Sequence, residues 1–69
     1  MGRFYETRAE ARDAARQMGE TLAVVGRHAT EPRGLLPWLS GFTYWPDVLA
    51  DLGTAALDAV FEGYKGVQR

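Results

Sequence analysis

Side chains that could carry out catalysis are few in this 69-residue sequence, and they do not form a recognisable set. His28 is the only histidine and cysteine is absent, so neither a metal-binding cluster nor a cysteine–histidine pair can be assembled. Ser40 and the threonines stand outside any nucleophile-elbow pattern, and no glycine spacing matches a phosphate-binding loop. We therefore predict a protein that is not an enzyme and that holds no cofactor and no metal.

Residue types that favour binding to other proteins are concentrated in one segment. Four of the eight aromatic residues lie between positions 38 and 45, and tryptophan and tyrosine are enriched among binding hot spots. We predict Trp38, Tyr44 and Trp45 as partner-binding residues. The competing interpretation is that the apolar side chains of this segment fold back into the core, which suits Leu35, Leu36, Leu39 and Phe42. For Trp45 both interpretations stay open, because its ring could also pack against the start of the next helix.

Charged residues at helical spacing form a second candidate binding feature. Arg8, Arg12 and Arg16 follow one another at i+4 steps and would form one flank of a helix. The opposite flank would carry the acidic residues Glu6, Glu10, Asp13 and Glu20. Both flanks could simply be solvated, or the arginine row could meet an acidic patch on a twin subunit or a target. Imitation of a nucleic-acid contact is a further alternative.

Two helices are predicted to position these side chains. The first covers residues 7–29, and its core-facing positions are spaced alternately four and three apart, as in a helix that meets another helix. These positions are Ala11, Ala15, Met18, Leu22, Val25 and Ala29. Pro32 prevents its continuation. Gly19, Gly26 and Gly53 lie within or near the helices, where they could be points of close helix packing or, equally, flexible points of the chain.

The second helix is predicted over residues 46–64, with Pro46 in its first turn and an end near Gly63 or Gly66. Its main apolar seam comprises Val48 or Leu49, Leu52, Ala56, and Ala59 or Val60. A second stripe, formed by Leu57, Phe61 and Tyr64, falls on another face. Two helices in a hairpin bury only one of these stripes, so the other needs the connector, a second subunit or a partner. Glu62 and Tyr64 would border a partner-binding face on this stripe.

The predicted fold class is all-α, a helix–long apolar connector–helix hairpin that forms a single domain over residues 1–69, with the connector at residues 30–45. A domain of this size buries only roughly 60% of the surface that its unfolded chain exposes, and oligomerisation is a common remedy. We therefore predict a homodimeric helical bundle. The residues assigned to its core or dimer interface are Met18, Leu22, Val25, Leu52, Leu57, Val60 and Phe61.

The charge balance and the hydropathy pattern exclude several classes of partner. Eight basic and nine acidic residues give a net charge of −1, whereas proteins that bind phosphate backbones usually carry a positive excess. Nucleic-acid binding is therefore disfavoured. No apolar run approaches the roughly 18 residues that span a bilayer, and residues 1–5 lack the pattern of a signal peptide. We expect a cytoplasmic protein that does not bind membranes.

The sequence resembles the very small helical anti-activator proteins with which temperate Pseudomonas phages counter host quorum sensing. The resemblance covers most of the chain and lies in its length, in the order helix, aromatic connector, helix, and in the stretch Tyr44-Trp45-Pro46-Asp47. It implies a dimer that binds a LuxR-type quorum-sensing transcription regulator, blocks its DNA binding and so assists takeover of the host. A second implied target is the type IV pilus assembly ATPase.

The same resemblance implies that Trp45 and its neighbours, together with Arg16, Glu62 and Tyr64, contact these partners. One protein that serves two unrelated targets needs an adaptable face, which a mixed aromatic and charged patch would supply. Two other function classes stay open on the sequence alone. They are a small DNA-binding protein that uses the arginine row, and a structural or antitoxin-like helical protein.

Overall fold

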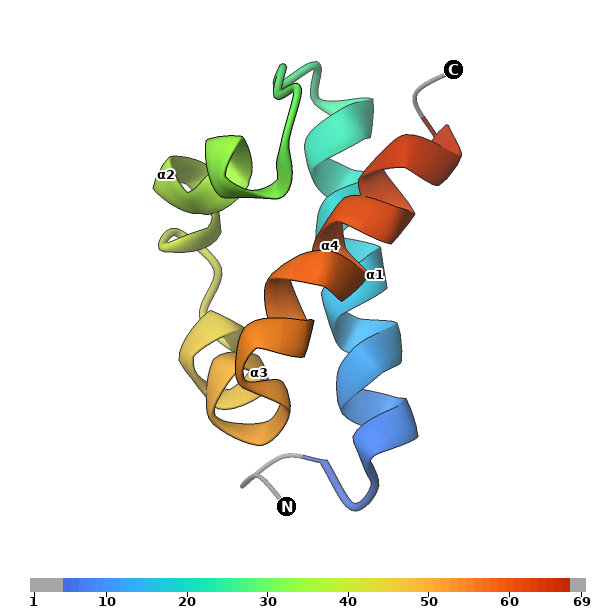
Figure 1. The fold of residues 1–69 in the computed structure, drawn as a ribbon, viewed down its shortest axis with the longest axis vertical. Helices are drawn as coiled ribbons and strands as arrows, with labels where there is room; N and C mark the ends of the chain where they lie inside the picture. Colours follow the sequence, from blue (N-terminus) through green and yellow to red (C-terminus); the bar gives the residue numbers. More distant parts are fainter. Residues whose placement is uncertain (1–4, 68–69) are drawn as a thin grey trace.

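The computed structural model describes residues 5–67, which form five helical segments joined by turns and loops (Figure 1). They are α1 (Arg8–Val24), the 3-10 helix η1 (Pro32–Leu35), α2 (Leu36–Leu39), α3 (Trp45–Leu52) and α4 (Thr54–Val67). The predicted all-α class is confirmed. None of the described helices combines the length and the apolarity that crossing a bilayer requires.

Helix α1 is delimited by its own sequence at both ends. The hydroxyl oxygen of Thr7 accepts a hydrogen bond from the backbone N–H of Glu10 at 3.2 Å, and the Glu10 carboxylate accepts one from the N–H of Thr7, which completes a capping box. At the other end Gly26 adopts a φ of 85°. The Gly26 N–H bonds the carbonyl of Ala23, and the next N–H, that of Arg27, bonds the carbonyl of Leu22. This Schellman motif ends the helix before residue 29, where the sequence pattern had placed its end.

The early end of α1 changes the predicted core on its last turn. Ala11, Ala15, Met18 and Leu22 are buried, as their spacing predicts. Val25 was assigned to the core or dimer interface and is instead 59% exposed, because the chain has already left the helical path at this residue. In the monomer Val25 therefore contributes nothing to the buried core.

The segment predicted as one helix over residues 46–64 is two helices. Gly53 has a φ of 59° and separates α3 from α4, so its role is to turn the chain rather than to permit close packing. Trp45, assigned above to the connector, is the first residue of α3, and Pro46 occupies the first turn, where a missing N–H costs no hydrogen bond. The second helix of the prediction therefore consists of a short α3 and a longer α4.

The two long helices, α1 and α4, pack against each other and point in the same direction (Figure 1). At one end Arg8 of α1 donates a hydrogen bond to the carbonyl of Asp51, just before α4 begins, at 3.0 Å. At the other end the Tyr64 hydroxyl bonds residues 27–29, which follow α1. In the predicted hairpin these helices would be antiparallel. The hairpin is wrong because the connector and α3 first carry the chain back to the starting end.

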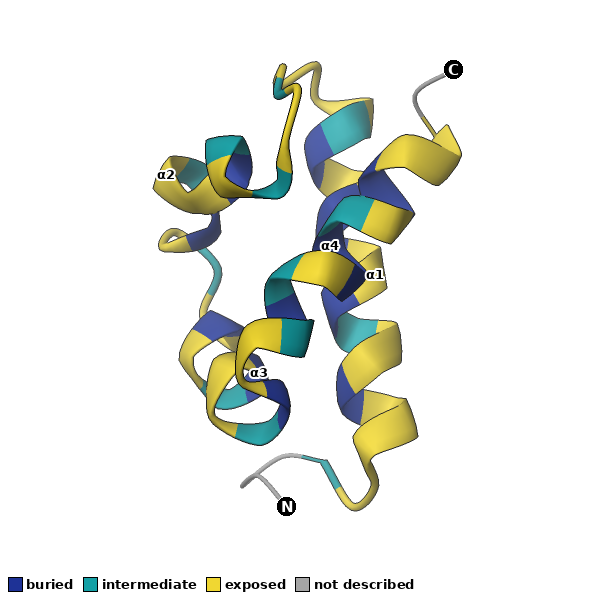
Figure 2. Ribbon diagram, in the orientation of Figure 1, coloured by how far each residue is buried: buried dark blue, intermediate teal, exposed yellow. Residues whose placement is uncertain are grey.

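Small residues let α1 and α4 approach until their backbones touch. A Cβ atom added at Gly19 would overlap the carbonyl oxygen of Val60 and would lie 2.7 Å from the backbone nitrogen of Tyr64. A Cβ atom at Gly63 would overlap the carbonyl oxygen of Arg16. Around these two glycines the seam is lined by alanines, and the buried residues of the two helices face each other (Figure 2). The alanines of the seam are Ala11, Ala15, Ala56 and Ala59.

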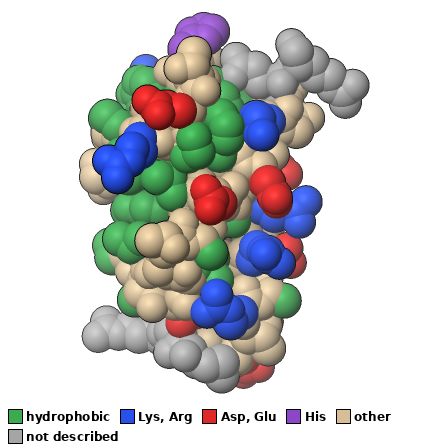
Figure 3. All heavy atoms as spheres, in the orientation of Figure 1, with side chains coloured by type: hydrophobic (Ala, Val, Ile, Leu, Met, Phe, Trp, Pro, Cys, Tyr) green, Lys and Arg blue, Asp and Glu red, His purple; other side chains and the backbone are tan. Residues whose placement is uncertain are grey.

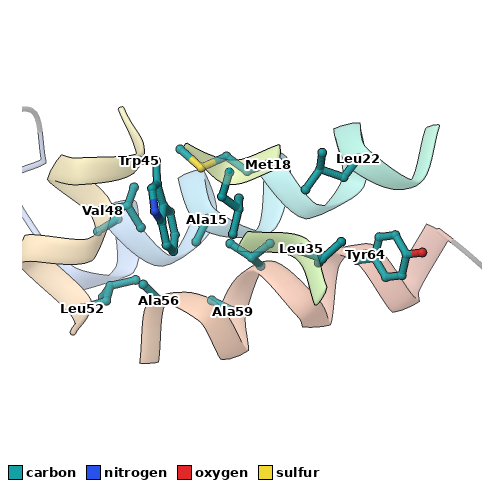
Figure 4. Packing of buried hydrophobic residues seen from close by; sticks show 13 residues of the cluster. Ala15, Met18, Leu22, Leu35, Trp45, Val48, Leu52, Ala56, Ala59 and Tyr64 are labelled. Atoms are coloured by element: carbon teal, nitrogen blue, oxygen red, sulfur yellow. The ribbon is translucent and has the colours of Figure 1, made fainter. Parts of the chain in front are cut away.

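The connector provides the third layer of the core. Leu35 and Leu39 are fully buried, so these two leucines fold back as the core interpretation requires, while Leu36 remains 40% exposed and Phe42 is half-buried. Together with Trp45, Val48 and Leu52 they cover one side of the α1–α4 pair (Figure 4). The second apolar stripe of α4 is largely covered in this way. Its Tyr64 is buried, and Leu57 and Phe61 are partly buried against the core.

Tyr64 ties the turn after α1 to the end of α4. Its hydroxyl donates a hydrogen bond to the carbonyl of Arg27 at 2.6 Å and accepts one from the N–H of Ala29 at 3.0 Å. We expect Tyr64→Phe to lower the free energy of unfolding by about 1 to 3 kcal/mol, because two backbone groups lose their partner. Urea denaturation followed by circular dichroism measures this change, and faster amide hydrogen exchange at Ala29 would localise it. A variant as stable as the wild type would contradict a structural role for the hydroxyl.

Candidate partner-binding surfaces

The three aromatic residues predicted to bind a partner occupy different environments. Trp45 is only 7% exposed and its ring points into the core beside Val48 and Ala15 (Figure 4). It therefore acts as a core residue, and the expectation of an exposed Trp45 anchor is wrong. Trp38 is half-buried, with the guanidinium of Arg27 at 5.6 Å from the centre of its ring. Tyr44 is 47% exposed and is the most exposed of the three.

Of the residues placed on the predicted mixed patch, Tyr64 is buried and Arg16 and Glu62 are exposed. Gly63, which follows Glu62, lies against the backbone of Arg16. Helix geometry therefore places the side chains of Arg16 and Glu62 on the side of the α1–α4 pair that the connector does not cover. Tyr44 borders the connector side. The single aromatic and charged patch of the prediction is thus not formed, because its members lie on two different sides of the molecule.

A groove of about 240 Å³ opens between α1 and the aromatic part of the connector. One wall consists of Tyr5, Phe42 and Tyr44, and the other consists of residues from one face of α1. The α1 residues are Ala14, Gln17, Met18 and Thr21. We call this feature the aromatic groove. It brings together three segments of the chain, residue 5, α1 and residues 42–44, and presents more aromatic surface than any other hollow described below.

Acidic residues border the aromatic groove on α1 and on α3. At 100° per residue, Glu10 falls on the groove face of α1, beside Gln17. Asp13 and Glu20 lie further round the helix, between Gln17 and Arg16. The Glu10 carboxylate is held at the start of α1, where it accepts hydrogen bonds from the backbone N–H groups of residues 6 and 7. Asp47 approaches the groove from the first turn of α3. Carboxylates are therefore the charges nearest to the aromatic rings, whereas Arg16 lies next to Asp13 and Glu20 at helical spacing on the far side of α1.

The ionisation of Tyr5 reports on this acidic environment. Burial raises the pKa of its hydroxyl above the ordinary value of 10.0, and the nearby charges of Asp47, Tyr44 and Asp51 raise it further, since a phenolate would be repelled by them. Because the pKa of Tyr5 is higher in the folded than in the unfolded chain, its protonated form favours the folded state. This contribution to the free energy of unfolding is fully present below pH 10 and is lost as the pH rises through the folded-state pKa.

We expect Asp47→Asn to lower the pKa of Tyr5 toward its ordinary value while burial keeps it raised, because one of the repelling charges is removed. Titration of the tyrosine ring carbons by NMR between pH 8 and 12 measures the shift, at about one-half pH-unit steps. Asp58→Asn, which removes an exposed carboxylate from α4, serves as the control and should leave the Tyr5 titration unchanged. Equal titration curves for wild type and Asp47→Asn would contradict the proximity of Asp47.

Two further hollows differ from the aromatic groove in their lining. The larger, of about 480 Å³, lies against the loop 28–31 and is lined by loop residues and by Tyr64. The smaller, of about 180 Å³, lies where Arg8 and Arg12 meet Leu52 and Ala55, on the bare side of the α1–α4 pair. Neither adds a cluster of metal ligands, since within residues 5–67 no group of three histidine, cysteine or acidic residues could hold a metal ion.

Several large apolar side chains remain exposed on the monomer. Val24, Val25, Leu36, Tyr44, Leu49 and Val67 are each at least 40% exposed. Val24 ends α1, Val25 follows it and Val67 ends α4, and the two helix ends lie at the same end of the molecule (Figure 1). On the face drawn in Figure 3, apolar side chains gather over the α2 side, and charged side chains of both signs lie over the side where α1 and α4 meet. Positive and negative side chains therefore share this side of the molecule.

Comparisons with protein-family models, with curated proteins and with solved structures gave no match to this chain. The candidate surfaces consequently rest on the geometry described above. Sequence analysis did not find the aromatic groove as a unit, because Tyr5, Phe42 and Tyr44 have no common spacing. The sequence of α1 did contain one indication of this groove. Ala14, Met18 and Thr21 follow one another at i, i+4 and i+7 and form an uncharged face beside the main seam.

Proposed function

We propose that the protein is a non-catalytic, protein-binding inhibitor that works as a homodimer. The observation that carries the proposal is the exposed aromatic groove with Tyr44 at its edge, next to an acidic flank. Tyrosine is enriched among the residues that contribute most to protein–protein binding, and aromatic rings bordered by charged groups are typical of such contacts. A protein of this size can inhibit a larger one simply by covering its working surface.

The proposed target is a LuxR-type quorum-sensing regulator, whose DNA binding the protein would block, with the type IV pilus assembly ATPase as a second target. This choice rests on the resemblance of the sequence pattern to phage anti-activators. A regulator of that kind presents a basic surface to DNA, and the acidic side of the present protein is complementary in charge to such a surface.

The decisive experiment uses a purified LuxR-type activator bound to fluorescent operator DNA. We expect an excess of the protein to release the activator, which lowers the fluorescence anisotropy of the DNA, and we expect no effect on an unrelated helix-turn-helix repressor. Co-purification from a Pseudomonas lysate with mass spectrometry tests both named targets at once. An activator that stays on its DNA at a large molar excess would contradict the proposed target.

The same DNA without activator tests the competing function. A protein that used its arginine row as a DNA-binding surface would shift the DNA by itself at low salt. We expect no such shift, because Arg16 shares the bare side of the α1–α4 pair with Glu62 and because the net charge is −1. A shift in the absence of activator would favour the nucleic-acid-binding alternative.

The dimer is supported by the valines exposed at the common end of α1 and α4. We expect sedimentation equilibrium at micromolar concentration to give twice the monomer mass of 7.6 kDa. The double variant Val24→Ser, Val25→Ser removes exposed apolar surface without touching the core, so it should weaken the dimer and leave the helical content unchanged. A stable monomer in the wild type would contradict the dimer and leave the inhibitor proposal standing.

A further inference from the structure

The size and lining of the aromatic groove favour a single side chain as its occupant. Its volume of about 240 Å³ lies below the roughly 300 to 1,000 Å³ that is usual for small-molecule sites. The walls are aromatic rings, and Met18 and Ala14 add an apolar surface on the α1 side. An occupant that matches these walls has a flexible apolar stem and a flat or charged end that stacks on a ring.

The charges around the groove select a cationic end. Glu10 lies on the groove face of α1, and Asp13 and Glu20 lie beyond Gln17 on the same helix. Asp47 contributes a further carboxylate from α3. The basic residues of α1 are Arg8, Arg12 and Arg16, and helix geometry places all three on the other flank, away from the groove. Along α1, the potential at the groove is therefore set by carboxylates.

We propose that the aromatic groove binds an arginine side chain from the basic surface of a partner protein. A guanidinium group stacks on aromatic rings and pairs with carboxylates, while its methylene stem packs on apolar surface such as that of Met18. The chain already contains one such contact, since the guanidinium of Arg27 lies 5.6 Å from the centre of the Trp38 ring. The inference rests on the proposed function, to which it adds the chemistry of the group that is bound.

The test uses the full-length, isotope-labelled protein and two synthetic peptides. The first is an alanine-rich helical peptide with three arginines at i, i+4 and i+8, and the second carries neutral, isosteric citrulline at the same positions. We expect the arginine peptide to shift the NMR amide signals of Tyr5, Thr21, Phe42 and Tyr44, with weaker binding at higher salt. We expect the citrulline peptide to leave these signals in place.

Matched variants separate the groove from the rest of the surface. Tyr44→Ala should weaken binding of the arginine peptide about threefold to fivefold, the loss of one exposed cation–π contact, and Tyr44→Phe should retain most of the binding. Leu49→Ala is the control for Tyr44→Ala, because Leu49 has a similar exposure of 44% outside the groove. To test the role of charge, Asp47→Asn should weaken binding of the arginine peptide, whereas Asp58→Asn should leave it unchanged. Circular dichroism melting verifies that each variant is folded.

Three results would overturn the inference. They are equal shifts with arginine and citrulline peptides, shifts that map to residues 8–16 on the arginine flank, and groove signals that move with protein concentration alone, which would make a second copy the occupant.

Failure of the proposed function gives different results. If the peptide binds the groove but the activator stays on its DNA, the arginine site stands and the target is wrong. If the activator is released equally by wild type and Tyr44→Ala, the function stands and the groove is not the site.

Discussion

Gly19→Ala is expected to destabilise the fold by about 3 kcal/mol, at the upper end of what overpacking usually costs. The added methyl group would overlap the carbonyl oxygen of Val60, and a backbone atom cannot move aside as the end of a flexible side chain can. Gly63→Ala should have a similar effect, because its methyl group would overlap the carbonyl oxygen of Arg16. Domains of this size are stable by only about 3 to 10 kcal/mol, so either variant should lose a large share of its free energy of unfolding.

Urea denaturation at 25 °C measures these losses, and Gly66→Ala provides the matched control. Gly66 lies on the same helix as Gly63, but a Cβ atom there meets nothing within 4 Å. Alanine should therefore be neutral at this position or stabilising by up to about 1 kcal/mol, in line with its higher helix propensity. Similar unfolding curves for Gly63→Ala and Gly66→Ala would show that α1 and α4 are not in backbone contact.

Trp45→Ala is expected to destabilise the protein by about 3 to 5 kcal/mol, the usual range for the loss of a large aromatic side chain from a core. The ring is 7% exposed and lies between α3 and α1, where alanine would leave a cavity (Figure 4). Any loss of partner binding in this variant would follow from the loss of the fold. Thermal unfolding followed by circular dichroism and by tryptophan fluorescence measures the effect.

Tyr44→Ala separates the two interpretations of the aromatic connector. Tyr44 precedes Trp45 in the chain and is 47% exposed, so its replacement should change the unfolding free energy by no more than about 0.5 kcal/mol. The expected pattern is a stability defect in Trp45→Ala and a binding defect in Tyr44→Ala. A Trp45→Ala protein that keeps its stability but no longer binds would contradict the core position of this ring.

Local sequence patterns were sufficient to predict the faces of the helices but not their arrangement. Ala11, Ala15, Met18 and Leu22 repeat at helical spacing, and this spacing alone identifies the buried face of α1. The same spacing is compatible with a parallel or an antiparallel neighbour. The direction of α4 is decided by the path of the connector and by the turn at Gly53, which depend on a backbone conformation that a helical periodicity does not encode.

The candidate site was predicted only in part, and the reason lies in where its residues come from. Tyr44 was identified from its residue type and remains exposed, whereas Trp45, of the same chemical character, is buried. Nothing in the local sequence distinguishes neighbours that point in opposite directions at a helix start. Tyr5 and Phe42 join the groove through contacts between segments that are distant in the chain, and contacts of this kind depend on the complete fold.

The parallel pairing of α1 with α4 also governs how the chain reaches its folded state. Residues that meet at the glycine seam, such as Gly19 and Val60, are separated by more than half of the sequence, so their contact closes a long loop. Such a topology folds more slowly than a helical hairpin of equal length, whose contacts are local. A nascent chain that ends before α4 leaves the glycine and alanine seam of α1 uncovered, because only α3 and the connector are then present to pack on α1. The core is complete only once residues 54–67 have been synthesised.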